Sequence, residues 1–204
     1  NRMTILCVII SIFLVTAIFS VADMMIRTQS DRMTGKNGSW HIELDGISQE
    51  TALKIAERDD VVSIGAVTIF NPDGELPYRM DGKRVVLYGI DESYLTMNST
   101  GAAEGRFPQG MGEIMLSSNA ARVLQVAVGD TVTLRTPSGD WDFTVSGLGG
   151  VEESYYSGQY SLMDAYLPRT AFAALMEQNN VHNLQTSYYV QFTSASKAAK
   201  AIPE

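Results

Sequence analysis

The chain has 204 residues and a net charge of −8, with a pI near 4.8. It has no cluster of Lys and Arg, and a protein that binds nucleic acid normally carries a basic face, so the charge argues against that class. The single cysteine, Cys7, rules out a disulfide within the chain, so the folded part depends on its apolar core.

An apolar run without a charged side chain covers residues 3–22. Its length matches the roughly 20 residues that a helix needs to cross the hydrocarbon core of a bilayer. The sequence therefore predicts a transmembrane helix over residues 1–23, with membrane lipid around residues 3–22. A secretory signal peptide cleaved after Ser20-Val21-Ala22 is the alternative. An uncleaved anchor is favoured because the run is longer than a usual signal-peptide core and helix-forming residues follow it.

A stalk helix is predicted over residues 24–35, because neither Gly nor Pro occurs in it before Gly35. Such a helix is a stiff rod that can transmit displacement between the bilayer and a folded domain, which a Gly/Ser linker could not do. Met25, Gln29 and Arg32 are the candidate coupling residues of this stalk. An inert membrane tether with the same helix remains an alternative.

The next segments predict a β-α-β unit. Residues 39–44 alternate as a half-buried strand does, and Ser48 is a typical N-cap for a helix that runs to Asp59-Asp60. Val61 to Phe70 is a strand rich in β-branched residues. After two turns, residues 84–89 form another strand, and the glycine-rich residues 93–112 are predicted to be loop.

The remaining segments alternate between short strands and short helices. Strands are predicted at 113–116, 131–135, 141–145, 164–167 and 187–192, and helices at 118–124, 169–178 and 194–201. Residues 137–140 form a hairpin loop between the second and third of these strands. The chain ends shortly after a strand that enters a helix, as a truncated β-α unit of a longer protein would.

The predicted fold class is α+β: an N-terminal transmembrane and stalk helix and a split β-α-β layer of the porter-like type, with a small β-rich subdomain inserted. The first half of the layer is placed at residues 36–92, the insert at 93–183, and the start of the truncated second half at 184–204.

A tyrosine-rich segment between the predicted strands at 141–145 and 164–167 is the candidate for partner contact. Tyr155, Tyr156 and Tyr160 accompany Gly and Glu there, and tyrosine suits contact surfaces because a large rigid ring costs little entropy to order. The alternative is that these rings cover the core of the insert.

The sequence lacks the residue patterns that catalysis would need. His41 and His182 lie away from any cysteine or acidic cluster with ligand spacing, so no metal site is predicted. There is no G-x-S-x-G elbow, no Walker lysine and no dinucleotide-binding glycine pattern. We therefore predict no catalytic residue and no cofactor, and any ATPase must lie on another subunit or region.

Several weak motifs follow one another along the chain in a definite order. They are Gly105-Arg106-Phe107-Pro108, Gly112-Glu113-Ile114-Met115-Leu116, Ala120-Ala121-Arg122-Val123-Leu124, Val128-Gly129-Asp130-Thr131-Val132-Thr133-Leu134, Val145-Ser146-Gly147 and Tyr166-Leu167-Pro168. In this order and spacing the chain resembles the extracytoplasmic domain of the MacB/FtsX-like ABC-transporter permeases, the mechanotransmission type.

The resemblance implies a bacterial cytoplasmic-membrane protein whose residues from about 36 face the periplasm or the extracellular space. It implies three further transmembrane helices after residue 204, a permease dimer, and a cytoplasmic ABC ATPase as partner. ATP-driven movement would then pass through the stalk to an outer substrate or partner. The alternative is a single-span membrane-tethered sensor or ligand-binding module.

Overall fold

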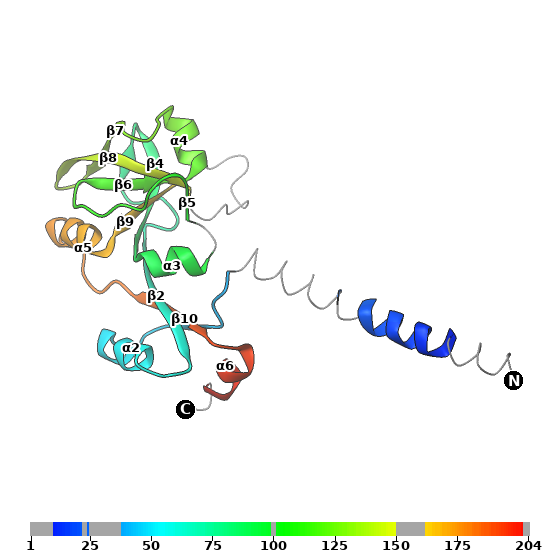
Figure 1. Cartoon of the computed structure of the whole chain (residues 1–204). Coiled ribbons are helices and arrows are strands. Elements are labelled where there is room, and N and C mark those ends of the chain that lie inside the picture. Colours follow the sequence, from blue (N-terminus) through cyan, green and yellow to red (C-terminus); the bar gives the residue numbers. More distant parts are fainter. Residues whose placement is uncertain (1–9, 22–23, 25–37, 99–100, 150–161, 202–204) are drawn as a thin grey trace, which may run out of the picture. The chain divides into compact units, whose positions relative to one another are not determined.

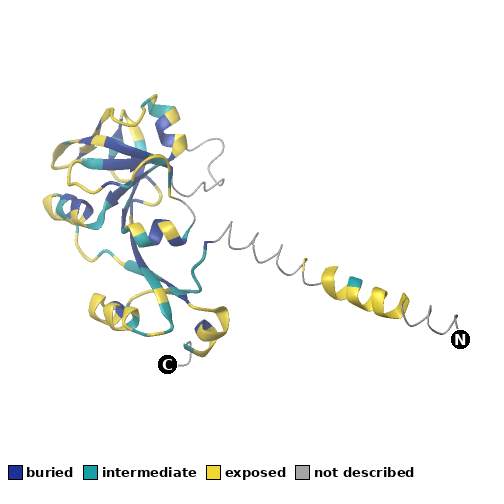
Figure 2. Ribbon diagram, viewed as in Figure 1, coloured by how far each residue is buried: buried dark blue, intermediate teal, exposed yellow. Residues whose placement is uncertain are grey.

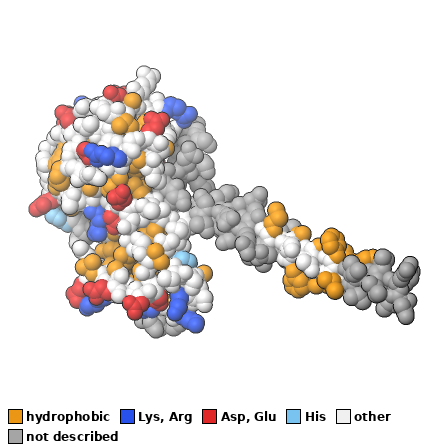
Figure 3. Space-filling view, viewed as in Figure 1, with side chains coloured by type: hydrophobic (Ala, Val, Ile, Leu, Met, Phe, Trp, Pro, Cys, Tyr) orange, Lys and Arg blue, Asp and Glu red, His pale blue; other side chains and the backbone are white. Residues whose placement is uncertain are grey.

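The computed structural model describes residues 10–21, 24, 38–98, 101–149 and 162–201. The chain divides into two compact units, residues 1–38 and 39–204, and each is described by itself. In the first unit, residues 10–21 are helical and the large apolar side chains of this helix are exposed. Figure 3 shows these hydrophobic side chains along the helix. No helix within the described ranges has the length and apolarity needed to cross a membrane.

One part of the second unit is a small layer of strands and helices (Figure 1). Its elements are β1 (Ile42–Leu44), α2 (Gln49–Ala56), β2 (Val61–Phe70), α3 (Glu92–Met97), β10 (Thr186–Phe192) and α6 (Ala195–Ala201). Strand β10 pairs antiparallel with both β1 and β2, so β1 and β2 are parallel to each other with β10 between them. Helix α2 connects them, which makes this a split β-α-β arrangement.

The two faces of this layer are covered by different helices. Ile64 and Ala66 of β2 pack with residues of α2 and α6, together with Tyr188 and Val190 of β10. Val67 faces the other way and packs with Tyr94 of α3. This alternation follows from the two-residue period of a strand, whose successive side chains point to opposite faces.

The other strands close into a barrel. They are β3 (Arg79–Met80), β4 (Lys83–Ile90), β6 (Glu113–Leu116), β7 (Thr131–Thr136), β8 (Gly139–Gly149) and β9 (Leu162–Pro168). Pairing runs in the order β4-β3-β7-β8-β6-β9 and returns from β9 to β4, and β5 (Ala102–Gly105) adds to β8 outside this ring. A closed ring leaves no free sheet edge where its strands are of equal length.

The barrel encloses the main apolar core. Leu87, Ile114, Leu134 and Val145 are completely buried, and Phe143 is 1% exposed. The helices α4 (Ser118–Leu124) and α5 (Arg169–Gln178) contribute buried residues to the same core. Figure 2 shows that buried residues concentrate in these strands and on the inner sides of the two helices.

Strand β4 belongs to both parts of the unit. Its residues Arg84 to Ile90 pair with β9 in the barrel, and its second half, Leu87 to Ile90, also pairs with Phe70 to Val67 of β2. One continuous sheet therefore includes residues predicted to belong to the first half of the layer and residues predicted to belong to the insert. The division at residue 92 stays a prediction.

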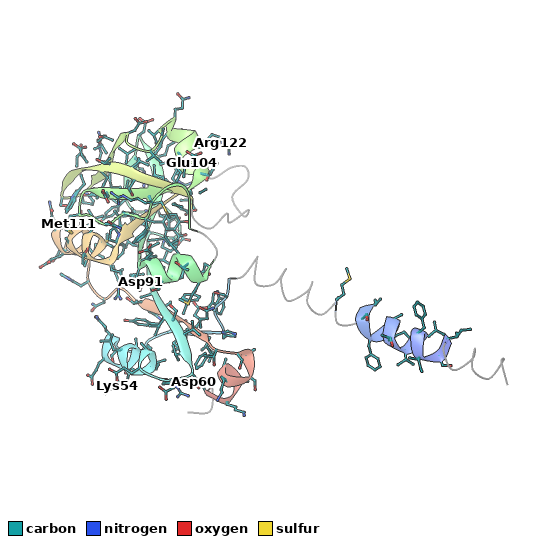
Figure 4. All side chains as sticks on the ribbon, in the orientation of Figure 1. Lys54, Asp60, Asp91, Glu104, Met111 and Arg122 are labelled. Atoms are coloured by element: carbon teal, nitrogen blue, oxygen red, sulfur yellow. The ribbon has the colours of Figure 1, made fainter. Side chains whose placement is uncertain are left out.

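The prediction of a loop over residues 93–112 was wrong in two places, because α3 and β5 lie within it. Helix α3 begins after Asp91, whose carboxylate accepts the backbone N–H groups of Tyr94 and Ala66, each at 2.9 Å. Burial raises the pKa of Asp91, and these two N–H groups partly offset that rise. Figure 4 shows Asp91 at the start of the helix. A six-residue helix is too short for its apolar period to be visible in the sequence.

The hairpin between β7 and β8 is tighter than predicted. Strand β8 begins at Gly139, opposite Thr136, so only Pro137 and Ser138 form the turn. Strand β8 continues to Gly149, beyond the predicted end at residue 145, and β9 begins at Leu162, before the predicted start at residue 164.

Candidate functional site

The six residues singled out in the sequence lie outside the described residues. These are the partner-contact candidates Tyr155, Tyr156 and Tyr160, and the coupling candidates Met25, Gln29 and Arg32. Their roles stay predictions. Two described sites adjoin those segments along the chain: the start of the second unit at Ser39, and the end of β8 at Gly149.

The two ends of the second unit are hydrogen-bonded to each other. The backbone N–H of His41 donates to the carbonyl of Val190 at 2.9 Å, and the N–H of Phe192 donates to Nδ1 of His41 at 3.1 Å. The His41 and Phe192 rings also meet edge to face, with centroids 6.5 Å apart. The segment that enters the unit is thus tied to the strand that leads out of it through α6. We call the contacts of residues 39–43 with β10 and α3 the terminal junction.

The terminal junction also reaches α3. The backbone N–H of Ser39 donates to the carbonyl of Met97, the last residue of that helix, at 2.5 Å. Trp40 and Tyr94 both pack edge to face on Tyr189, with centroids 5.0 and 5.1 Å away. Such aromatic pairs contribute about 0.5–1.5 kcal/mol beyond the area they bury.

A short polar contact completes the terminal junction. The hydroxyl of Tyr189 donates to Oε1 of Glu43 at 2.6 Å. Burial, and then this bond to a carboxylate, raise the pKa of Tyr189 well above its ordinary value. The raised pKa keeps the phenol protonated at neutral pH, so that it can donate this bond between β1 and β10.

Replacing His41 by phenylalanine should destabilise the terminal junction. It leaves the part-buried N–H of Phe192 without its acceptor, at a cost of about 1–3 kcal/mol. Because Nδ1 accepts this bond, the ring proton lies on Nε2, and an asparagine side-chain oxygen can take the acceptor's place. We expect His41→Asn to retain most of the stability, as measured by urea unfolding. Faster hydrogen exchange at Phe192 in His41→Phe alone would locate the effect, whereas equal exchange in both variants would contradict it.

The second site is the segment that connects β5 to β6. Gly105 has a φ of 72°, and the N–H of the next residue, Arg106, donates to the carbonyl of Ser146 on β8 at 2.9 Å. This contact needs glycine at position 147, because a Cβ there would lie 2.4 Å from the carbonyl oxygen of Arg106. The motifs around residues 105 and 147 thus meet in space, although Arg106 and Ser146 are 40 positions apart in the sequence.

An ion pair holds the connecting segment in one shape. The guanidinium of Arg106 binds both carboxylate oxygens of Glu113, at 2.8 and 2.5 Å. The same carboxylate accepts the backbone N–H groups of Gln109 and Gly110, at 2.8 and 3.2 Å. The bond from Arg106 and then that from Gln109 lower the pKa of Glu113 to about 2. We call residues 105–113 with their contacts to β8 the locked loop.

Replacing Arg106 by glutamine should raise the pKa of Glu113 from about 2 towards its ordinary value. The lowered pKa means that the folded state gains stability from this carboxylate above the pKa of the unfolded chain and loses it as the pH falls through about 2. Carbon-13 NMR of the Glu113 carboxyl during an acid titration measures the change. An unchanged pKa in Arg106→Gln would show that the backbone N–H groups alone set it.

Sequence reasoning found the pieces of the locked loop but not their contacts, and it missed the terminal junction. His41 and Phe192 are 151 positions apart, and nothing local marks them as partners. No group of three or more His, Cys, Asp or Glu side chains able to hold a metal occurs in the described parts of the chain.

The class of protein follows from this arrangement together with the comparisons. A sequence profile of the MacB-like periplasmic core domain matches residues 3–204. The fold is similar to the periplasmic region of MacB from Actinobacillus actinomycetemcomitans, with a TM-score of 0.55 and 16% identity over 78% of this chain and 72% of that one. The extracellular domain of the noncanonic ABC-type transporter YknZ from Gram-positive bacteria gives a TM-score of 0.53 and 16% identity over 76% and 77%.

The chain belongs to the MacB-like periplasmic core domain family. This confirms the resemblance to the MacB/FtsX-like permeases of ABC transporters. Among curated proteins no relative matches the chain.

Proposed function

We propose that this chain is the extracytoplasmic domain of a mechanotransmission-type permease subunit, anchored by its first helix in the bacterial cytoplasmic membrane. ATP hydrolysis by a cytoplasmic ABC ATPase moves the stalk, and the domain passes this movement to an outer substrate or partner. The domain itself is not catalytic. The proposal rests on the terminal junction, together with the fact that the chain is a member of this family.

The membrane anchor is supported by the helix at residues 10–21. Phe13, Ile18 and Phe19 are 66–71% exposed there. Exposed apolar side chains all around a helix are unfavourable in water but favourable in lipid. The rest of the proposed span, residues 3–9 and 22, lies outside the described residues.

The coupling is supported by the hydrogen bonds of the terminal junction. A pull on Ser39 acts directly on α3 through Met97, and a pull on His41 acts on β10 through Val190 and Phe192. Strand β10 is also paired with β2 along seven residues, so the displacement spreads through the whole layer. A tether joined only by a flexible loop would lack these bonds, and for this reason we favour coupling over an inert tether. The family of the chain favours the permease over a single-span sensor.

The partners follow from the same proposal. Two permease subunits act together with the ATPase, and Tyr155, Tyr156 and Tyr160 are the proposed contact with the outer partner. They follow β8, whose end is held by β5 and whose middle is held by the locked loop. When the residues that flank a contact segment are rigid, less conformational entropy is lost on binding.

The decisive experiment breaks the stalk in the full-length permease assembled with its ATPase. Met25→Pro together with Gln29→Pro should interrupt the helix, since each interior proline costs about 3 kcal/mol or more. A spin label on a cysteine at Leu53, which is exposed on α2, reports the distance between the two subunits in a background where Cys7 is serine. We expect ATP to change this distance in the parent protein and not in the proline variant.

The matched control is Met25→Ala with Gln29→Ala, which preserves helix propensity and should keep the ATP response. An ATP response in the proline variant equal to that of the parent would mean that the stalk is only a tether. Absence of any response in the parent, or failure of an ABC ATPase to co-purify, would contradict the proposed function as a whole.

A further inference from the structure

Helix α3 packs on β2 through its backbone. A Cβ at Gly65 of β2 would lie 2.5 Å from the backbone nitrogen of Tyr94 and 2.6 Å from its Cα. Asp91 adds a second link between the two elements, because its carboxylate accepts the N–H groups of both Tyr94 and Ala66. A contact between two backbones has no side-chain rotamer that could absorb a displacement, so α3 and β2 move together.

The last residue of α3 is bonded to the segment that enters the second unit. The carbonyl of Met97 accepts the backbone N–H of Ser39 at 2.5 Å and also its hydroxyl at 3.1 Å. Met97 is 2% exposed, and its Cε would lie 2.6 Å from a Cβ at Gly65. A movement of Ser39 therefore acts on a residue that is fixed to the layer by close packing.

Strand β5 follows α3 after residues 98–101 and holds the end of β8. Ala102 pairs with Gly149, the last residue of β8. A Cβ at Gly149, whose φ is 153°, would lie 2.6 Å from the carbonyl oxygen of Gly101 and 2.8 Å from the nitrogen of Ala103. Figure 4 shows Glu104 on β5. A displacement of β5 therefore acts directly on the backbone at the end of β8.

We infer that α3 and β5, together called the relay, carry movement from the terminal junction to the end of β8. The relay begins at Met97 and ends at Gly149, just before the segment with the proposed contact tyrosines. It passes from the layer to the barrel within one stretch of chain, whereas the route through paired strands runs from β2 through β4, β9 and β6 to β8. The inference rests on the proposed coupling function, because it names the path that the movement takes beyond the terminal junction.

The test lengthens the connection between α3 and β5 in the full-length permease assembled with its ATPase. Inserting Gly-Ser-Gly after Asn98 adds up to about 10 Å of slack, and a short insertion in a loop costs little stability. The control is the same insertion after Gly46, which is exposed between β1 and α2 and lies outside the relay. Hydrogen–deuterium exchange is measured with ATP and without nucleotide in residues 39–44 and 146–149.

The two insertions should separate the ends of the relay. In the parent and in the Gly46 insertion, we expect ATP to change the exchange rates of both segments. In the Asn98 insertion, the change in residues 39–44 should persist, because the terminal junction is intact, and the change in residues 146–149 should be lost. A purely structural role of the connection would alter exchange without ATP and leave the ATP response in place.

A pair of substitutions tests the contact at the end of the relay. Gly149→Ala forces β5 away from β8, because the new Cβ meets the backbone of Gly101 and Ala103. Gly101→Ala changes the opposite side of the same contact, where a Cβ would meet no atom within 4 Å. We expect the ATP response of residues 146–149 to be lost in Gly149→Ala and kept in Gly101→Ala. The insertion after Asn98 decides the question if Gly149→Ala does not fold.

A route of contacts is established only when both of its ends respond to the same cause. If ATP changes exchange in residues 39–44 of the parent but not in residues 146–149, the relay is wrong and the coupling function stands. A retained response of residues 146–149 in the Asn98 insertion would assign the transmission to β4 instead. If ATP changes neither segment in the parent, the proposed function fails and the relay fails with it.

Discussion

Replacing Leu87 by alanine should lower the free energy of unfolding by about 2–5 kcal/mol, the range for a buried leucine. Leu87 is completely buried in the barrel core, and it pairs with Phe70 of β2 on one side and Ala165 of β9 on the other. Because β4 is shared by the barrel and the first layer, the loss should destabilise both together. We expect the melting temperature to fall by roughly 5–15 °C.

The two tryptophans make the cooperativity of this effect measurable. Trp141 packs against the barrel core, and Trp40 belongs to the terminal junction of the layer. In single-tryptophan variants Trp40→Phe and Trp141→Phe, Leu87→Ala should shift both fluorescence midpoints in urea equally. A shift seen only by Trp141 would mean that the layer unfolds independently of the barrel.

The control for Leu87→Ala is Leu53→Ala. Leu53 lies on α2 and is 59% exposed, so the same substitution removes little buried surface there. Its effect should stay within about 0.5 kcal/mol. A comparable loss at Leu53 would point to a general effect of leucine removal rather than to the shared strand.

The second large effect is expected for Gly147→Ala. The new Cβ would lie 2.4 Å from the carbonyl oxygen and 3.1 Å from the nitrogen of Arg106, and backbone cannot move aside as a flexible side chain can. Such overpacking costs about 1–3 kcal/mol. It should also break the bond from the Arg106 N–H to Ser146, so exchange of the Arg106 amide should accelerate.

Gly112→Ala is the matched substitution within the same loop. A Cβ at residue 112 would meet no atom within 4 Å, and we expect a change below about 0.5 kcal/mol in urea unfolding. If the two glycines respond alike, close backbone approach is not the reason for glycine at position 147.

Elements with strong local signals were predicted with correct bounds. The helices Ser118–Leu124 and Arg169–Gln178 and the strand Val61–Phe70 lie where the sequence placed them. Ser117 caps the first helix by accepting the N–H of Ala120, and β-branched residues dominate the strand. In each case residues adjacent in sequence carry the information.

The candidate site was predictable only in part. The sequence named the stalk and the tyrosine-rich segment from composition and helix propensity, and both lie outside the described residues. It did not indicate the terminal junction, because its contacts join residues between 58 and 151 positions apart. It also missed α3, since six residues show no clear helical period and their stability comes from Asp91 and from packing on β2.

The sequence by itself determined the family, the apolar run and most of the local elements, since motif order, hydropathy and capping are properties of neighbouring residues. Only the tertiary structure decided that six strands close into a barrel and that β4 joins this barrel to the layer. These features depend on strand pairing. Pairing is selected by the burial of the whole core, which no short segment encodes.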